Sequence, residues 1–120
     1  MARLAAVGVL SFCLGVGWAH GCLHAGAQSP EVAEALADAA ATYGVSEGWL
    51  RAIARCESGF RPWVTSPGGH MGLLQFHPRT WAWMSQQAGY GGTNPYDAWA
   101  AAHVAAWALS RGYARHWACA

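Results

Sequence analysis

Hydrophobic residues recur along the chain at the spacing of helices. A first helix is expected to begin at Ser29-Pro30-Glu31, because these residues supply a capping hydroxyl, a proline for the first turn and an acid near the positive end of the helix dipole. It is expected to end at Gly44. The apolar residues that share one of its faces are Val32, Leu36, Ala39 and Tyr43.

A second helix is expected after Ser46, which would cap it, with Glu47 in the first turn. Gly59 and Pro62 would end this helix, because glycine favours a helix end and proline cannot continue it. Its apolar stripe consists of Trp49, Leu50, Ile53 and Cys56.

Two more helices are predicted in the second half of the chain, over residues 78–88 and 94–110. Before them, residues 58–70 are rich in Ser, Gly and Pro and are expected to form a loop. Residues 71–76 form a short apolar stretch that is either extended or a tight turn. The chain is therefore expected to be a small all-α domain with at most a minor extended element.

The first 27 residues do not belong to this pattern. A positively charged start precedes an uncharged apolar run (residues 4–19), and Ala25-Gly26-Ala27 has the small-x-small shape of a signal-peptidase site. The apolar run is shorter than the ~20 residues that a membrane-spanning helix needs. We therefore expect residues 1–27 to be a cleaved signal peptide, residues 28–120 to form one folded domain, and the protein to be secreted or held in the cell envelope. Cleavage before Cys22, with lipidation of that cysteine, is the alternative.

Composition and charge exclude several classes of protein. The chain contains 54% hydrophobic and 11% charged residues, which excludes a disordered chain. Its formal net charge is +1 and it contains no basic run, so we expect no nucleic-acid partner. The histidine spacings match no zinc signature, so we expect no metal and no cofactor. We also expect a monomer. The histidines outside the predicted signal peptide are His70, His77, His103 and His116.

Glu57 stands out because it continues an apolar helix face. It lies four residues after Ile53 and seven after Leu50, so the three side chains share one side of the second predicted helix. The carboxyl group is therefore expected to point into the packed side, near the negative end of the helix dipole. Both desolvation and the dipole favour a protonated carboxyl, which a general acid for a glycosidic bond needs. From the pattern alone, an exposed glutamate at a helix end is the alternative.

The residues around Glu57 carry a longer motif. Residues 56–62 read C-E-S-G-F-R-P, and residues 66–78 read S-P-G-G-H-M-G-L-L-Q-F-H-P. This resembles the catalytic signature of the soluble lytic transglycosylase (SLT) domain of the lysozyme-like superfamily, which reads E-S-G-x-x-P and then S-x-x-G-x-x-G-L-x-Q-x-x-P. The spacings from Glu57 to Ser66 and to Gln75, nine and eighteen residues, match the family.

The resemblance implies roles for individual residues. Glu57 matches the catalytic glutamate, which protonates the bridging oxygen and then acts as a base. Ser66 matches a serine near the catalytic carboxyl, and Gln75 matches a glutamine that contacts the substrate. The segment that contains Met71 matches the wall of the glycan cleft, in which we expect Gly72 to let the backbone approach the sugar closely.

The sequence departs from the family at several positions. His70 stands where the family usually has a small residue, and His77 stands where it often has methionine. The fourth predicted helix lacks the tyrosine that usually faces the catalytic site. Trp107 or His103 would be the candidates for its place.

Tryptophan is abundant, with eight residues in the chain. Aromatic faces stack on sugar rings, and we expect Trp63, in the loop after the second helix, to form such a platform for the glycan. Three others lie within predicted helices and are expected to fill the core instead. These are Trp49, Trp99 and Trp107.

Export to an oxidising compartment would allow the cysteines of the folded domain to form a disulfide. Cys13 and Cys22 fall within the predicted signal peptide, which leaves Cys56 and Cys119 either to pair in an oxidising compartment or to remain two separate buried thiols. The ending H-W-A-C resembles a shorter branch of lysozyme-like domains, in which a C-terminal Trp-x-Cys pairs with the cysteine before the catalytic glutamate. The resemblance therefore supports a Cys56–Cys119 bridge that braces the end of the second helix.

The activity implied by the resemblance is cleavage of the β-1,4 bond between N-acetylmuramic acid and N-acetylglucosamine in peptidoglycan, by a lytic transglycosylase that forms 1,6-anhydromuramic ends. No second carboxylate lies within the signature, which fits a mechanism with one glutamate, assisted by the substrate's N-acetyl group. Asp97 is the one candidate for a second acid, which would allow a lysozyme-type muramidase to hydrolyse the same bond. A non-catalytic glycan-binding domain on the same fold is the third possibility.

Overall fold

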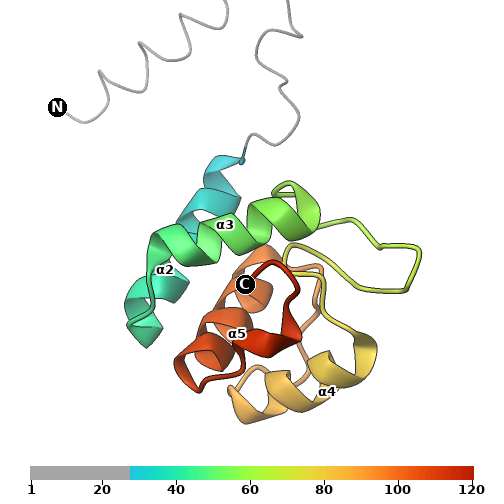
Figure 1. Cartoon of the computed structure of the whole chain (residues 1–120). Coiled ribbons are helices and arrows are strands. Elements are labelled where there is room, and N and C mark those ends of the chain that lie inside the picture. The colour runs from blue at the N-terminus through green and yellow to red at the C-terminus, as the bar shows by residue number, and fades with distance from the viewer. Residues whose placement is uncertain (1–27) are drawn as a thin grey trace, which may run out of the picture.

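The computed structural model describes residues 28–120, so the predicted signal peptide, with Cys22, lies outside the described residues. None of the helices in residues 28–120 is long and apolar enough to cross a membrane. The same range contains no strand, only two isolated β-bridges that involve Met71, so the predicted all-α class is confirmed. The helices, drawn in Figure 1, are α2 (Pro30–Tyr43), α3 (Glu47–Ser58), α4 (Pro78–Gln87) and α5 (Ala98–Ser110), followed by a 3₁₀ turn (Ala114–His116).

Helices α2 and α3 begin and end where their capping residues predict, and α4 begins where its proline predicts. The hydroxyls of Ser29 and Ser46 accept backbone N–H groups from the first turns of α2 and α3, at 3.2 and 3.1 Å. Gly44 and Gly59 follow these helices with φ of 67° and 61°, the left-handed conformation that ends a helix. Pro78 opens α4 as predicted.

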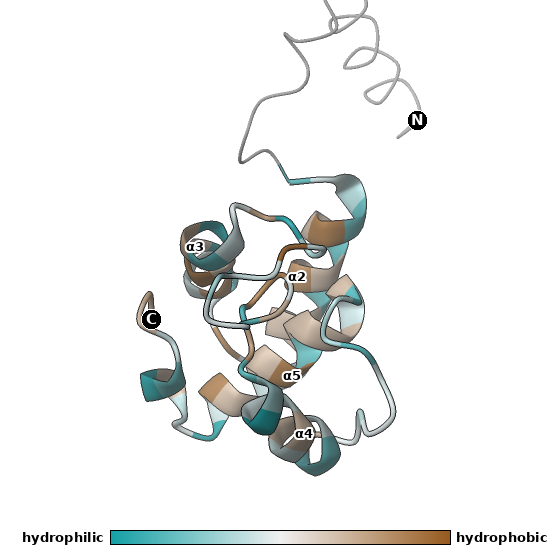
Figure 2. Cartoon of the chain, turned by 90° about the vertical axis from the view of Figure 1, so that its right-hand side faces the viewer, coloured by the Kyte–Doolittle hydropathy of each residue, from teal (hydrophilic) through white to brown (hydrophobic). Residues whose placement is uncertain are grey.

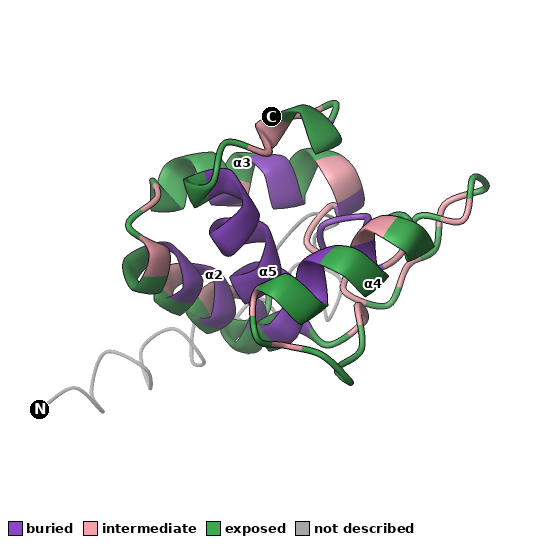
Figure 3. Ribbon diagram, turned by 90° about the horizontal axis from the view of Figure 1, so that it is seen from below, coloured by how far each residue is buried: buried purple, intermediate pink, exposed green. Residues whose placement is uncertain are grey.

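α5 is the central helix of the domain. Every residue from Ala98 to Leu109 except Trp99 is buried, as the purple of this helix in Figure 3 shows. α5 packs against α2, α3 and α4. Figure 2 shows few hydrophilic positions along α5, whereas α3 carries hydrophilic and hydrophobic residues on different sides. A helix that is apolar all round is typical of a core element, and the small alanines of α5 let its neighbours approach closely.

The start of α5 differs from the prediction, which placed it at residue 94. The side chain of Asn94 accepts the Tyr96 N–H at 2.8 Å, and the Asp97 N–H donates to the Asn94 carbonyl at 2.9 Å. These residues therefore form a turn of their own. The Asp97 carboxylate then caps α5, because it accepts an N–H of the first turn at 3.2 Å, and the helix begins at Ala98.

Only one of the three tryptophans that were predicted to fill the core is buried. Trp107 is buried as expected, but Trp49 and Trp99 are 37% and 45% exposed. Each of the two exposed residues stands next to a fully or largely buried neighbour, Leu50 and Ala98. One step along a helix turns the side chain by about 100°, which carries both indoles out of the core. The tryptophans in the core are Trp81, Trp107 and Trp117.

Candidate active site

α3 brings Glu57 to the edge of a cavity and not into the packed core. Leu50 and Ile53, on the same helix face, are fully buried, whereas Glu57 in the last turn is half-buried. Cys56, which was predicted to extend the apolar stripe, is exposed. The buried side of α3 is formed by Leu50, Ile53, Ala54 and Ser58, and Cys56 lies beside this face, not on it. The cavity, of about 360 Å³, is lined by Glu57, Ser66, His70, Gln75, His116 and Ala118.

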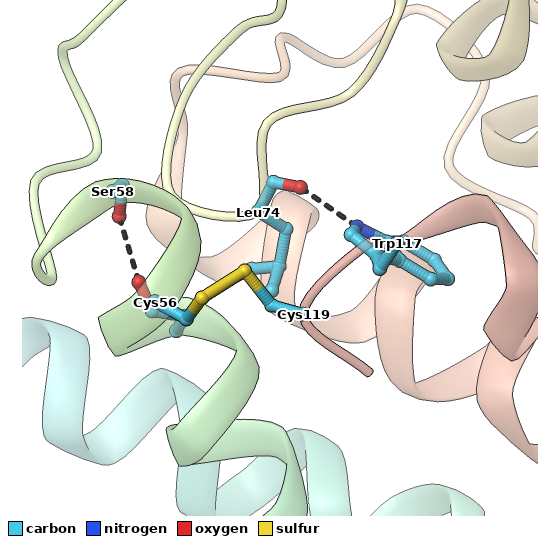
Figure 4. Close-up of a disulfide and its surroundings, with 6 residues drawn as sticks. Cys56, Ser58, Leu74, Trp117 and Cys119 are labelled. Atoms are coloured by element: carbon cyan, nitrogen blue, oxygen red, sulfur yellow. Dashed lines mark hydrogen bonds between the residues drawn. A yellow bond between two sulfur atoms is a disulfide. The ribbon is translucent and has the colours of Figure 1, made fainter.

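The chain turns away from α3 directly after Ser58, the residue that follows Glu57. The buried Ser58 hydroxyl donates to the Ala54 carbonyl at 3.1 Å (Figure 4) and accepts a backbone N–H from the following turn at 3.1 Å. Gly59 and Phe60 both adopt left-handed φ, of 61° and 62°. For Phe60 this is a strained conformation, of the kind that clusters at functional sites. Ser58 therefore fixes the end of α3 and leaves Glu57 as its last side chain at the cavity.

Ser66 and His70 close a tight loop in the cavity wall. The Ser66 N–H donates to the His70 carbonyl at 2.9 Å, and the His70 N–H donates to the Ser66 hydroxyl at 3.1 Å. The Nδ1 atom of the His70 ring lies 3.4 Å from the same hydroxyl. The Ser66 oxygen is thus held by the backbone and faced by the ring of one residue, in a cavity that it shares with Glu57.

Gln75 lies at the end of a tight turn over residues 72–75, closed by Met71, which forms β-bridges on both sides. Its backbone has a left-handed φ of 53°. Its side-chain Nε2 group donates to the carbonyls of Gly72 and Val64, at 2.9 and 3.3 Å. Since both amide protons are used within the protein, the side-chain carbonyl oxygen is the atom left for a substrate N–H or O–H.

Gly72 permits a close contact inside the protein. Its φ is 77°, and a Cβ at this position would lie 2.1 Å from the carbonyl oxygen of Pro95. We expected Gly72 to let a sugar approach the backbone, but the group that approaches is this carbonyl. The hydroxyls of Tyr96 and Thr65 also form a hydrogen bond. These two contacts fix the segment from Thr65 to Gly72, called the cavity loop, to the turn before α5.

The C-terminal segment supplies one wall of the cavity. The predicted bridge between Cys56 and Cys119 is present and joins residues 63 positions apart. Next to it, the buried Trp117 donates its indole N–H to the Leu74 carbonyl at 2.7 Å, as Figure 4 shows. These two links hold the segment that carries His116 beside the end of α3.

The structure brings together three of the five predicted site residues. Glu57, Ser66 and Gln75 line the same cavity. Met71 is half-buried and braces the turn behind the cavity, without being part of its lining. Trp63 is 70% exposed and lies outside the cavity lining, on the loop after α3.

Neither candidate for the family's tyrosine lies at the cavity. Trp107 packs against the rings of Trp83 and Tyr113, and His103 donates to Asp38. Neither is among the residues that line the cavity, and both are buried in the packing of α5.

His116 and Ala118 were missed from the sequence as site residues. The signal that could have found them is their place beside Cys119, because a bridge from Cys119 to Cys56 fixes that segment next to Glu57.

The histidines have separate partners. His103 contacts the Asp38 carboxylate through Nε2 at 2.7 Å and the Trp99 carbonyl through Nδ1 at 2.8 Å. His77 caps α4 by accepting the Arg79 N–H at 3.2 Å. Over residues 28–120, no three His, Cys, Asp or Glu side chains are grouped as metal ligands.

Comparison with known protein families gives a match over most of the chain. Residues 34–117 match the model of the transglycosylase SLT domain. The matched range runs from the first half of α2 to Trp117 and includes the cavity residues Glu57, Ser66 and Gln75. None of the curated proteins matches the chain. Since the matched segment is well over half of the sequence and the fold is all-α, the chain belongs to the transglycosylase SLT domain family of the lysozyme-like superfamily.

Proposed function

We propose that the protein is a peptidoglycan lytic transglycosylase. Its substrate is the β-1,4 bond between N-acetylmuramic acid and N-acetylglucosamine, and its products carry 1,6-anhydromuramic ends. The observation that carries this proposal is that Glu57 is the one carboxylate among the described residues that line the cavity. The family match supports the substrate class.

The reaction needs one group that gives a proton and then takes one back. The protonated Glu57 donates its proton to the bridging oxygen, the bond from that oxygen to C1 of muramic acid breaks, and the sugar's N-acetyl carbonyl stabilises the positive charge at C1. The C6 hydroxyl of the same sugar then attacks C1, and the Glu57 carboxylate takes the hydroxyl proton. The anhydro ring closes without water, and Glu57 returns to its protonated form.

The other polar groups of the cavity serve to orient the glycan. The free carbonyl oxygen of Gln75 accepts an N–H or O–H from a sugar, since its amide protons are already bonded. The exposed indole of Trp63 offers a stacking face for a sugar ring farther along the strand. The backbone bonds that fix Gln75 give its oxygen one orientation, which favours a single register of the substrate.

Hydrolysis of the same bond is the second candidate. A hydrolase with two catalytic carboxylates needs the second one across the scissile bond, to act as a nucleophile or to activate a water molecule. Asp97 was the residue considered for this role, but it is an exposed cap of α5 and does not line the cavity. A cavity with one carboxylate favours ring closure by the substrate's own hydroxyl.

Product analysis tests the proposal. The purified protein, with its disulfide intact, is incubated with peptidoglycan, and the soluble muropeptides are identified by mass spectrometry. Anhydro-muropeptides are the expected product. Reducing-end muropeptides would instead indicate a muramidase, and binding to the glycan without any product would indicate a non-catalytic domain.

Two substitutions on α3 control the experiment. Glu57→Gln keeps the shape of the side chain and removes the titratable group, so it should abolish the products. Glu47→Gln changes an exposed glutamate that pairs with Arg51 at 2.8 Å, at the opposite end of the same helix, and should leave them unchanged. Equal loss of activity in both variants would argue against a catalytic role for Glu57.

We further propose that the protein is exported, with residues 1–27 as its signal peptide. The Cys56–Cys119 bridge supports export, because disulfides persist in oxidising compartments. Sequencing the N-terminus of the exported protein tests the proposal. A start at Gln28 would agree with it, a lipidated start at Cys22 would indicate a lipoprotein, and an unprocessed chain retained in the cytoplasm would contradict it.

A further inference from the structure

The hydrogen bonds around Ser66 allow its hydroxyl proton to point either at the His70 ring or into the cavity. The Ser66 oxygen accepts the His70 N–H at 3.1 Å, and the His70 Nδ1 lies 3.4 Å from it. The hydroxyl either donates its proton to Nδ1 or accepts a proton from it, because an imidazole nitrogen serves in both roles. Only in the second arrangement is the Ser66 proton free to point into the cavity that Glu57 lines.

The groups around His70 allow its ring to gain a charge. The ring of His77 packs edge-on at a centroid distance of 5.7 Å, and its Nδ1 accepts the Arg79 N–H. The other titratable groups at the cavity are Glu57 and His116. A negative Glu57 favours a cationic His70, and a cationic His116 opposes it.

We propose that His70 is a positioning residue, which directs the Ser66 hydroxyl into the cavity when its own ring is protonated. The inference rests on the proposed transglycosylase function. A cationic His70 donates through Nδ1 to the Ser66 oxygen, and the Ser66 O–H then donates into the cavity. Negative charge develops there as Glu57 gives its proton to the substrate, and a fixed donor that faces this charge stabilises the transition state.

A neutral His70 ring that carries its proton on Nε2 has the opposite effect. Its Nδ1 accepts the Ser66 proton and withdraws it from the cavity, so the charge that develops on Glu57 loses one hydrogen bond. A hydrogen bond to a charged group corresponds to about ten-fold in rate. Since histidine side chains change charge between about pH 5 and 8, kcat/KM should fall by about this factor as the pH rises through that range, in addition to any effect of Glu57.

The pH profile of kcat/KM on peptidoglycan tests this in the wild type and three variants. In His70→Asn, the amide nitrogen takes the place of Nδ1 and donates at every pH. The variant should therefore keep the low-pH activity and lose the fall in kcat/KM between about pH 5 and 8 (the step). Ser66→Ala should be less active and should also lose the step. His116→Asn changes the other histidine of the cavity, which has no bond to Ser66, and should retain the step whatever its rate.

A step that survives in both His70→Asn and Ser66→Ala overturns the inference, and so does a step that disappears in His116→Asn alone. Loss of the step in the first two variants, together with its persistence in the third, supports it. The circular dichroism of each variant shows whether it is folded. His70→Gln is the control for His70→Asn: its amide lies one bond farther along the side chain, so it should not keep the low-pH activity.

A readout that needs no activity separates this inference from the proposed function. The titration of each ring is followed by NMR on protein with isotope-labelled histidine. Ser66→Ala should move the titration midpoint of His70 and leave that of His77 in place. If the wild type cuts no peptidoglycan but this coupling is present, the proposed function fails and the pairing of His70 with Ser66 stands. If the protein is active and the His70 midpoint does not respond to Ser66→Ala, the inference fails.

Discussion

At the scale of single residues, the cavity is shaped by bonds from side chains to the backbone. Gln75 donates to two carbonyls, Ser66 accepts an N–H, and Trp117 donates to a carbonyl. The first two residues therefore use part of their hydrogen-bonding capacity for structure and present the rest to the cavity. Substitution of such a residue changes the shape of the site as well as its chemistry.

Among the described glycines, Gly72 has the least space for an added Cβ atom. We predict that Gly72→Ala lowers the free energy of unfolding by about 3 kcal/mol, because it combines an unfavourable left-handed φ with overpacking against the Pro95 carbonyl, 2.1 Å from the added Cβ. Urea denaturation monitored by circular dichroism measures the loss.

The control for this prediction is another glycine with positive φ. Gly69 has a φ of 84° and no atom within 4 Å of an added Cβ. Gly69→Ala should therefore lose only the conformational part, about 1 kcal/mol. An equal loss in the two variants would mean that the approach of Pro95 has no energetic weight.

At the scale of elements, the helix boundaries that depend on local chemistry could be predicted from the sequence. Ser29, Ser46 and Gly59 act as caps through contacts with their own helices. The start of α5 could not be predicted in this way, because both Asn94 and Asp97 carry capping side chains. Asp97 is the residue that caps α5, while the turn over residues 94–97 is held against Gly72 by a contact distant in sequence.

For the candidate site too, the sequence predicts what depends on local residues and misses what depends on distant contacts. Glu57, Ser66 and Gln75 could be found because their spacing forms a motif within one segment, and that segment folds as a helix end and two tight turns. Trp63 and Met71, which share that segment, do not line the cavity, because sequence proximity does not fix which way a side chain points. The wall at His116 arises from a disulfide across most of the domain, which no local pattern describes.

Asp97 provides a prediction about α5. Asp97→Ala should lower the free energy of unfolding by about 1 kcal/mol through loss of the cap, whereas Asp97→Asn, which keeps a capping oxygen, should be close to neutral. Both variants should form the same products as the wild type, because Asp97 does not line the cavity. A folded Asp97→Asn protein that no longer cuts peptidoglycan would restore the two-carboxylate hydrolase as the better mechanism.

The loop after α4 provides a prediction about pH. Burial first, and then the neighbouring Tyr43, raise the pKa of Tyr90 above its ordinary value of 10.0. The folded state therefore holds the Tyr90 proton more tightly than the unfolded state does. The contribution of this proton to the free energy of unfolding is fully present below about pH 10 and is lost as the pH rises through the higher pKa of the folded state. Urea denaturation above pH 10 should show a steeper loss of stability in the wild type than in Tyr90→Phe. Identical slopes would assign the alkaline loss to another group.

At the scale of the whole molecule, a disulfide joins α3 to the C-terminal segment. The Cys56–Cys119 bridge joins residues 63 positions apart and closes a loop that contains α4 and α5. Near the bridge, Trp117 donates a hydrogen bond to the Leu74 carbonyl, which holds the C-terminal segment against the turn over residues 72–75. The bridge therefore affects stability, through the unfolded chain, and the site, through the cavity wall at His116.

These two effects separate in the double variant Cys56→Ser/Cys119→Ser. A closed loop of this length is worth about 4 kcal/mol in the chain-entropy model, and we predict a loss of this size in urea denaturation. Under conditions where the variant is still folded by circular dichroism, KM for peptidoglycan should rise more than kcat falls, because Glu57 keeps its place on α3 while the wall at His116 is no longer held. Wild type reduced with a thiol should behave as the double variant does. Unchanged KM in both would mean that the Trp117 bond alone holds the wall, and Trp117→Phe in the reduced protein should then raise KM instead.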